Sequence, residues 1–143
     1  MTTESSVNSG NGAQPAAELL QGTGLNASMT VNDLQKSLTW YQNVLGFSLV
    51  QKYEREGKAV AASLSAGDAK VLIGQDDGAK GWDRVKGVAI SLQITTSQNV
   101  DEIADRAKAA GGVIEAGPTD TPWGARMFRI KDPDGFTYVI SSR

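Results

Sequence analysis

The sequence predicts an α+β fold in which two β-α-β-β-β modules form one curled mixed sheet. The same order of apolar-alternating strands around one amphipathic helix occurs twice in the 143-residue chain, which indicates an internal repeat. Near the end of the chain, two alternating runs flank the turn sequence D-P-D-G at 132–135, as they do in a β-hairpin. Two half-sheets, each with one helix outside, must curl against each other to hide their edges.

The first module is expected over residues 25–75, after a disordered leader over 1–24 that is rich in Ser, Gly, Asn and Thr. Leu25 to Val31 alternates apolar and polar residues, as a half-buried strand does. Asn32-Asp33 offers a helix N-cap, and apolar residues follow at helical spacing until Gly46 ends the helix. Three more strands are predicted, over residues 47–53, 58–65 and 69–74.

A linker over residues 76–86 leads to the second module, which is expected over 87–143. Its first strand is predicted from Val88 to Ile94 by apolar alternation, and a helix follows from Val100 to Gly112. Three further strands are predicted, over residues 113–116, 126–131 and 136–141. Residues 25–143 therefore form one domain with two modules.

The alternation in the last hairpin assigns its two faces. One side should pack on helices and carries Phe128, Ile130, Phe136, Tyr138 and Ile140. The other side carries Met127, Arg129, Thr137, Val139 and Ser141. This second side is too polar for a core and too weakly charged for an ordinary solvated face, so we interpret it as the wall of a cavity. Asp68 aligns with Asp134, 66 residues later, and the same offset transfers the wall to the first module.

Composition excludes several classes of function. The net charge is −2 with no basic stripe, which argues against nucleic acid or a membrane surface as partner. The chain has no Cys and no His, so it lacks thiol chemistry, the commonest general base and the commonest transition-metal ligand. No secretory signal or run of roughly 20 apolar residues is present, and we expect a cytoplasmic protein. Exposed sheet edges in a single chain favour a homodimer.

Two sequence runs carry a family resemblance. V-N-D-L-Q-K-S-L-T-W-Y-Q-N-V-L-G-F at 31–47 and P-W-G-A-R-M-F-R-I-K-D-P-D-G-F at 122–136 resemble the vicinal oxygen chelate superfamily. That superfamily includes glyoxalase I, the extradiol dioxygenases, and the fosfomycin and bleomycin resistance proteins. The resemblance implies the glyoxalase/bleomycin resistance fold. In metal-dependent members the ligands come from four positions, which correspond here to Asn26, Ile73, Gly87 and Val139. None of them is His, Asp or Glu, so the resemblance implies a metal-free member without a cofactor.

Alternation and the repeat offset together define the predicted cavity wall. Its positions are Asn26, Ser28, Thr30, Ala61, Ser63, Val71, Ile73, Ala89, Ser91, Gln93, Met127, Arg129, Thr137, Val139 and Ser141. Small side chains and neutral hydrogen-bonding groups suit a small organic ligand of mixed polarity, although such residues also fill narrow barrels that bind nothing. The predicted ligand-binding residues are Asn26, Ser28, Thr30, Ser63, Trp82, Ser91, Gln93, Trp123, Met127, Arg129 and Val139.

Three large residues have competing interpretations. Trp82 and Trp123 would form a rim that stacks on a planar ligand, or they would pack at a subunit interface. Arg129 would clamp a carboxylate or phosphate, or it would form a salt bridge to a loop acid such as Asp76 or Asp77.

No catalytic group is predicted. No serine on the wall has an adjacent base, and the acid pairs Asp76-Asp77 and Asp101-Glu102 are expected to be solvated or to favour a helix start. The predicted function is therefore metal-free binding of a small molecule, as in resistance by sequestration of an antibiotic-like or aromatic ligand. The alternatives are a lyase, isomerase or dioxygenase with an atypical or absent metal site, and an interaction module with a vestigial cavity.

Overall fold

The structure is a computed structural model that describes residues 19–143, so most of the leader predicted over 1–24 lies outside the described residues. The first module consists of β1 (Ala27–Val31), α1 (Leu34–Asn43), β2 (Ser48–Arg55), β3 (Lys58–Ala66) and β4 (Ala69–Gln75). The second module consists of β5 (Ser91–Thr96), α2 (Val100–Ala109), β6 (Ile114–Asp120), β7 (Arg126–Lys131) and β8 (Thr137–Ser142).

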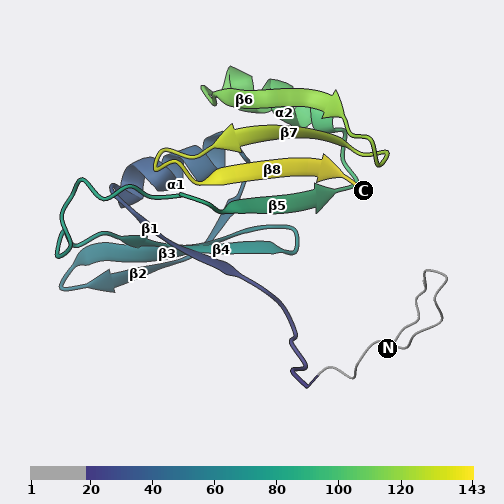
Figure 1. The fold of residues 1–143 in the computed structure, drawn as a ribbon. Coiled ribbons are helices and arrows are strands. Elements are labelled where there is room, and N and C mark those ends of the chain that lie inside the picture. The colour runs from purple at the N-terminus through teal and green to yellow at the C-terminus, as the bar shows by residue number, and fades with distance from the viewer. Residues whose placement is uncertain (1–18) are drawn as a thin grey trace.

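The two modules have the same topology. One sheet has the strand order β1-β4-β3-β2 and the other has the order β5-β8-β7-β6. In each sheet the first and last strands of the module pair in parallel, and the other neighbours are antiparallel. Figure 1 shows the second sheet above the first, with both helices behind them. The predicted α+β fold with two β-α-β-β-β modules is confirmed.

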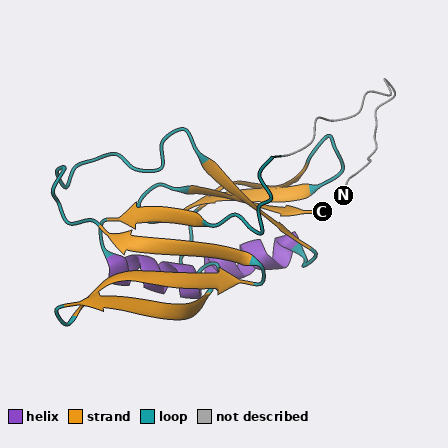
Figure 2. Cartoon of the chain, turned by 90° about the horizontal axis from the view of Figure 1, so that it is seen from below, coloured by secondary structure: helices purple, strands orange, loops and turns teal. Residues whose placement is uncertain are grey.

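The first helix begins at the predicted cap, and the second begins at a cap that was not predicted, Asn99. The Asp33 side chain accepts a hydrogen bond from the backbone N–H of Lys36, and the Asn99 side chain accepts one from that of Glu102. Gln75 adds to the first cap because its Oε1 accepts the N–H of Leu34 at 2.9 Å. These caps fix where each helix starts against its sheet. Figure 2 shows both helices on the same side of the strands. Among residues 19–143, no helix has the length and apolar character needed to cross a membrane.

One continuous core joins the two modules. Leu38 and Tyr41 of α1, Leu64 of β3, and Phe128 and Tyr138 of the last hairpin are buried in it together. The helix-facing side predicted for that hairpin is therefore confirmed, with Phe136 half-buried at its edge. Burial of large apolar side chains on one face of each sheet leaves the opposite face for solvent or a ligand.

The cavity-wall positions that the repeat offset predicted on β4 were wrong by one residue. Val71 and Ile73 are buried in the core rather than on the ligand face. Leu64 pairs with Val71 in the first module, whereas Ile130 pairs with Tyr138 in the second, so the second hairpin has one extra residue in its turn. A slip of one residue moves every side chain of a strand to the other face. Leu72, in register with Ser28 and Ser63, takes the position on the open face.

Both first strands begin later than predicted. Leu25 is 96% exposed and precedes β1, and Val88 and Ile90 are 66% and 54% exposed in a turn before β5. Ala89 lies in this turn with a φ of 60°, so it does not belong to the sheet wall. The apolar alternation of Val88 to Ile94 was a correct strand signal only from Ser91 onward.

A buried polar cluster lies where the modules meet. The Tyr41 hydroxyl is 2.8 Å from Oδ2 of Asp132 and 2.9 Å from the Tyr138 hydroxyl. Oδ1 of Asp132 accepts the backbone N–H groups of Asp134 and Phe136 at 2.9 and 2.8 Å. Burial raises the pKa of Asp132 above its ordinary range and raises the pKa of both tyrosines. These contacts connect the helix of the first module to the last turn of the second.

Candidate ligand-binding face

The open face of the first sheet carries a row of small side chains. Ser28, Leu72 and Ser63 lie side by side in register on β1, β4 and β3. Ser28 and Leu72 are exposed and Ser63 is half-buried. The row is mostly neutral and presents two hydroxyl groups beside an aliphatic surface.

The open face of the second sheet has a matching row that includes a charge. Gln93, Val139 and Arg129 are in register on β5, β8 and β7. Val139 is buried although it is on this face, between Gln93 and Arg129 on the flanking strands. Thr137 and Ser141, two residues away on either side, are buried in the same way. The central strand thus forms a floor, and Arg129 is a half-buried cation beside it.

An open pocket of about 780 Å³ lies at the start of β5. Its residues come from the linker before β5 and from β5, β7, β8 and the turn between the last two strands. They are Arg84, Val85, Lys86, Gly87, Val88, Ala89, Ile90, Ser91, Arg129, Lys131, Asp134, Gly135 and Thr137. Of the residues predicted to bind a ligand, Ser91 and Arg129 line this pocket.

The linker is held in place by an ion-pair cluster. One carboxylate oxygen of Asp76 lies 3.2 Å from Arg84 and 2.9 Å from the Nζ of Lys86. Lys86 also donates to the side-chain oxygen of Asn32 at 2.7 Å. Asp76 is buried rather than solvated as predicted, and hydrogen bonds from the N–H of Gly78 and from Lys86 hold its pKa well below the ordinary range. The cluster fastens the linker to the start of α1.

Arg129 is not part of this cluster. No carboxylate of residues 19–143 lies within ion-pairing distance of its guanidinium. The alternative of a salt bridge from Arg129 to Asp76 or Asp77 is therefore wrong, because Asp76 pairs with Arg84 and Lys86 and the Asp77 side chain accepts from the N–H of Ala79.

A close contact between two glycines brings the linker to the last turn. A Cβ added at Gly87 would lie 2.4 Å from the carbonyl oxygen of Gly135. Gly87 also has a φ of +74°, a conformation that side chains with a Cβ rarely adopt. The backbone of the linker can pass over the D-P-D-G turn only because Gly87 has no side chain.

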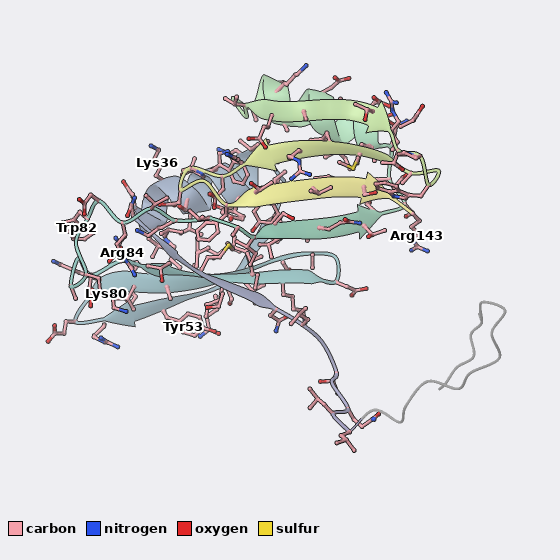
Figure 3. All side chains as sticks on the ribbon, in the orientation of Figure 1. Lys36, Tyr53, Lys80, Trp82, Arg84 and Arg143 are labelled. Atoms are coloured by element: carbon pink, nitrogen blue, oxygen red, sulfur yellow. The ribbon has the colours of Figure 1, made fainter. Side chains whose placement is uncertain are left out.

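The two predicted rim tryptophans do not meet. Trp82 is 60% exposed on the linker at the left of Figure 3, and Trp123 is 75% exposed in the turn between β6 and β7. That turn lies at the opposite end of the molecule from the linker in Figure 1. One small ligand cannot contact both residues, so they do not form a common rim within one chain.

The other predicted site residues are divided between the two sheets. Asn26 is exposed just before β1, Thr30 is exposed on β1, and Met127 is half-buried on β7. The prediction missed Leu72 in the row of the first sheet. It also missed five pocket residues, namely Arg84, Lys86, Val88, Ile90 and Lys131. The R-V-K sequence at 84–86, with two cations close to the start of a strand, was a signal that could have found the linker residues.

The predicted position of the second acid pair is confirmed. Asp101 and Glu102 lie in the first turn of α2, where the helix dipole favours acids. Asp101 also accepts two hydrogen bonds from Arg126, at 2.8 and 3.0 Å, and this lowers the pKa of Asp101. Asp101 therefore joins α2 to β7.

The side chains on the open face do not fit a transition-metal site. Of the four positions implied by the resemblance, Ile73 is in the core, and Leu72 takes its place on the open face. Gly87 lies in the linker before β5, and Ser91 takes its place because Gln93 pairs with Val139 as Ser28 pairs with Leu72. The set becomes Asn26, Leu72, Ser91 and Val139, which offers one amide, one hydroxyl and no imidazole or carboxylate. Within residues 19–143, no group of three or more His, Cys, Asp or Glu side chains is placed to hold a metal ion.

The chain belongs to the Glyoxalase/Bleomycin resistance protein/Dioxygenase superfamily, because the model of that family matches residues 25–140. A probable lactoylglutathione lyase of Vibrio cholerae is 31% identical over 118 residues, covering 78% of this chain and 84% of the relative. A lactoylglutathione lyase of Neisseria meningitidis is 32% identical over 121 residues, with the same shares of both chains covered.

Solved structures show the same fold. TioX from Micromonospora sp. ML1 matches with a TM-score of 0.67 at 24% identity, covering 85% of this chain and 98% of that one. A superfamily member from Sphaerobacter thermophilus matches with a TM-score of 0.67 at 23% identity, covering 84% and 98%.

Proposed function

We propose that this protein binds a small organic molecule on the open face of its sheets, without the help of a metal. The observation that carries the proposal is the row Gln93, Val139 and Arg129, which continues into an open pocket of about 780 Å³. A concave site with an apolar floor and a few placed polar groups is the usual form of a small-molecule site. Neither a nucleophile with its base nor a metal donor set accompanies the row among the described residues.

Filling the pocket should weaken ligand binding. Ser91 is exposed and lines the pocket, so a Ser91→Trp variant would place an indole ring in it without disturbing the core. We expect this variant to weaken a ligand found by a thermal-shift screen by about 10-fold or more. The matched control is Thr39→Trp, an exposed residue on α1, which should leave the shift unchanged. Equal shifts for wild type and Ser91→Trp would place the ligand elsewhere.

A second candidate function comes from the relatives. Two of them, at 31% and 32% identity, are named lactoylglutathione lyases, which favours a lyase for this chain as well. The donor set on the open face argues against a lyase that depends on a divalent metal. Leu72 and Val139 cannot coordinate through their side chains, and Asn26 and Ser91 offer only an amide and a hydroxyl.

Metal content and activity separate the two functions. We expect tag-free protein purified from rich medium to contain less than about 0.1 equivalent of Zn²⁺, Ni²⁺, Mn²⁺ or Fe²⁺ by elemental analysis. We also expect no lactoylglutathione lyase activity, with or without added Ni²⁺ or Zn²⁺. The Neisseria meningitidis relative, prepared in parallel, serves as the comparison for the assay. Stoichiometric metal together with activity lost on chelation would establish the lyase instead.

A further inference from the structure

One of the cations that line the pocket at the start of β5, Arg129, has no carboxylate partner among residues 19–143. We propose that this pocket binds the carboxylate or phosphate group of an amphipathic organic ligand, with Arg129 as its anchor. The inference rests on the function proposed above and names the class of ligand for the same site. Four basic residues line the pocket, namely Arg84, Lys86, Arg129 and Lys131.

Three of the four cations have partners. Asp76 serves both Arg84 and Lys86. Lys131 lies 3.1 Å from Glu115 in a pair that is about half exposed.

The one acidic residue among the lining residues, Asp134, directs its carboxylate to the first module. There it accepts the N–H of Asn32 at 2.9 Å and the hydroxyl of Ser37 at 3.3 Å. Arg129 is left as the lining cation that has no carboxylate within reach in the described part of the chain.

The position of Arg129 suits recognition of an oxyanion. A guanidinium binds a carboxylate or phosphate through two parallel hydrogen bonds, and partial burial strengthens that interaction over its value in water. Arg129 is half-buried and lines the pocket from β7, so its guanidinium can meet a bound group there. The Thr137 hydroxyl lines the same pocket and can donate a further hydrogen bond.

Two apolar residues that line the pocket predict that the ligand has an apolar part. Val88 and Ile90 line the pocket from the linker turn and are 66% and 54% exposed. The turn that presents them contains Ala89 in the left-handed region, a conformation of the kind that is concentrated at ligand clamps. Exposed aliphatic side chains beside an uncompensated cation are complementary to an organic anion rather than to a free inorganic ion.

The test uses three probes that share a phenyl ring, with the full chain. Phenyl phosphate and benzoate carry the two candidate anionic groups on one ring, and benzamide is their neutral analogue. Titrations followed by NMR should give saturable shifts of the Arg129 Nε–H signal with at least one of the two anions. We expect benzamide and inorganic phosphate to bind at least about 10-fold more weakly than the preferred anion. The stronger of the two anions identifies the group that the pocket selects.

Variants assign the effect to Arg129. Arg129→Ala should weaken the preferred anion by about 10-fold or more, and Arg129→Lys should recover part of that loss because it keeps the charge without the two-pronged geometry. The matched control is Lys70→Ala, an exposed cation on β4 of the first module that does not line the pocket, and it should change binding by less than about 2-fold. Circular dichroism of each variant checks the fold.

Three outcomes would overturn the inference. They are no saturable binding of either anion, equal binding of benzamide and benzoate, and equal losses for Arg129→Ala and Lys70→Ala. When one of these three outcomes is found, the anion inference fails. The proposed function still stands if a neutral ligand from the thermal-shift screen binds wild type and loses binding in Ser91→Trp. If no ligand responds to Ser91→Trp, the proposed function fails as well.

Discussion

A Gly87→Ala variant is expected to have a free energy of unfolding about 3 kcal/mol below that of wild type. The added Cβ would lie 2.4 Å from the backbone oxygen of Gly135, and a backbone atom cannot rotate away as a side chain can. The left-handed conformation adds a cost of about 1 kcal/mol for any residue with a Cβ. Because the linker must then lift away from the last turn, we also expect weaker ligand binding in the pocket.

A variant at a second glycine separates the cost of the clash with Gly135 from the cost of the left-handed backbone conformation. Gly57, in the turn between β2 and β3, has a φ of +78° and nothing within 4 Å of an added Cβ. Gly57→Ala should therefore cost only about 1 kcal/mol. Urea denaturation of both variants with unchanged m-values gives the comparison. Equal losses of unfolding free energy in the two variants would show that the linker does not pack closely against the D-P-D-G turn.

Replacing Asp132 with alanine is expected to destabilise the protein by about 3 kcal/mol. The change removes the acceptor of two backbone N–H groups and the partner of the Tyr41 hydroxyl in a buried site. Asp132→Asn keeps an oxygen acceptor in the same place and should cost less than about 1.5 kcal/mol at neutral pH. Similar losses for the two variants would mean that side-chain shape, rather than hydrogen bonding, is what the site requires.

The pH dependence of Asp132 has a definite sign. Burial raises the pKa of Asp132 in the folded chain, whereas the unfolded chain has an ordinary carboxyl pKa near 3.8. Between these two values the folded state binds more protons, so the stability contributed by Asp132 falls as pH rises. Asn does not titrate. The stability of wild type minus that of Asp132→Asn should therefore decrease from pH 3.8 upward through the raised pKa. A difference that increases with pH would contradict a raised pKa.

Local patterns predicted the elements well because each pattern had one physical cause. The faces of the last hairpin followed from alternation, and the start of the first helix followed from Asp33, which caps through its short side chain. The errors arose where a contact distant in the sequence decided the structure. The alternation of Val88 and Ile90 predicted a strand, but these residues lie in a turn before β5, next to the close contact of Gly87 with Gly135.

The ligand face was predictable only in part. The rows that contain Ser28, Ser63, Gln93 and Arg129 followed from period-2 alternation. Leu72 was missed because the two hairpin turns differ by one residue, a difference that an offset taken from Asp68 and Asp134 does not reveal. The burial of Asp76 was missed because its partners come from elsewhere along the linker, and side-chain pairing of this kind leaves no periodic signal.

The hydrogen bond between Tyr41 and Asp132 affects whether one module of the repeat can fold without the other. Tyr41 belongs to the first module and Asp132 to the second, and their hydrogen bond lies in a core to which both modules contribute. A half-chain cut at the linker would expose half of that core and leave a buried hydroxyl without its carboxylate. Although the sequence reads as two copies of one unit, neither copy is an independent domain, and thermal unfolding should follow a single cooperative transition.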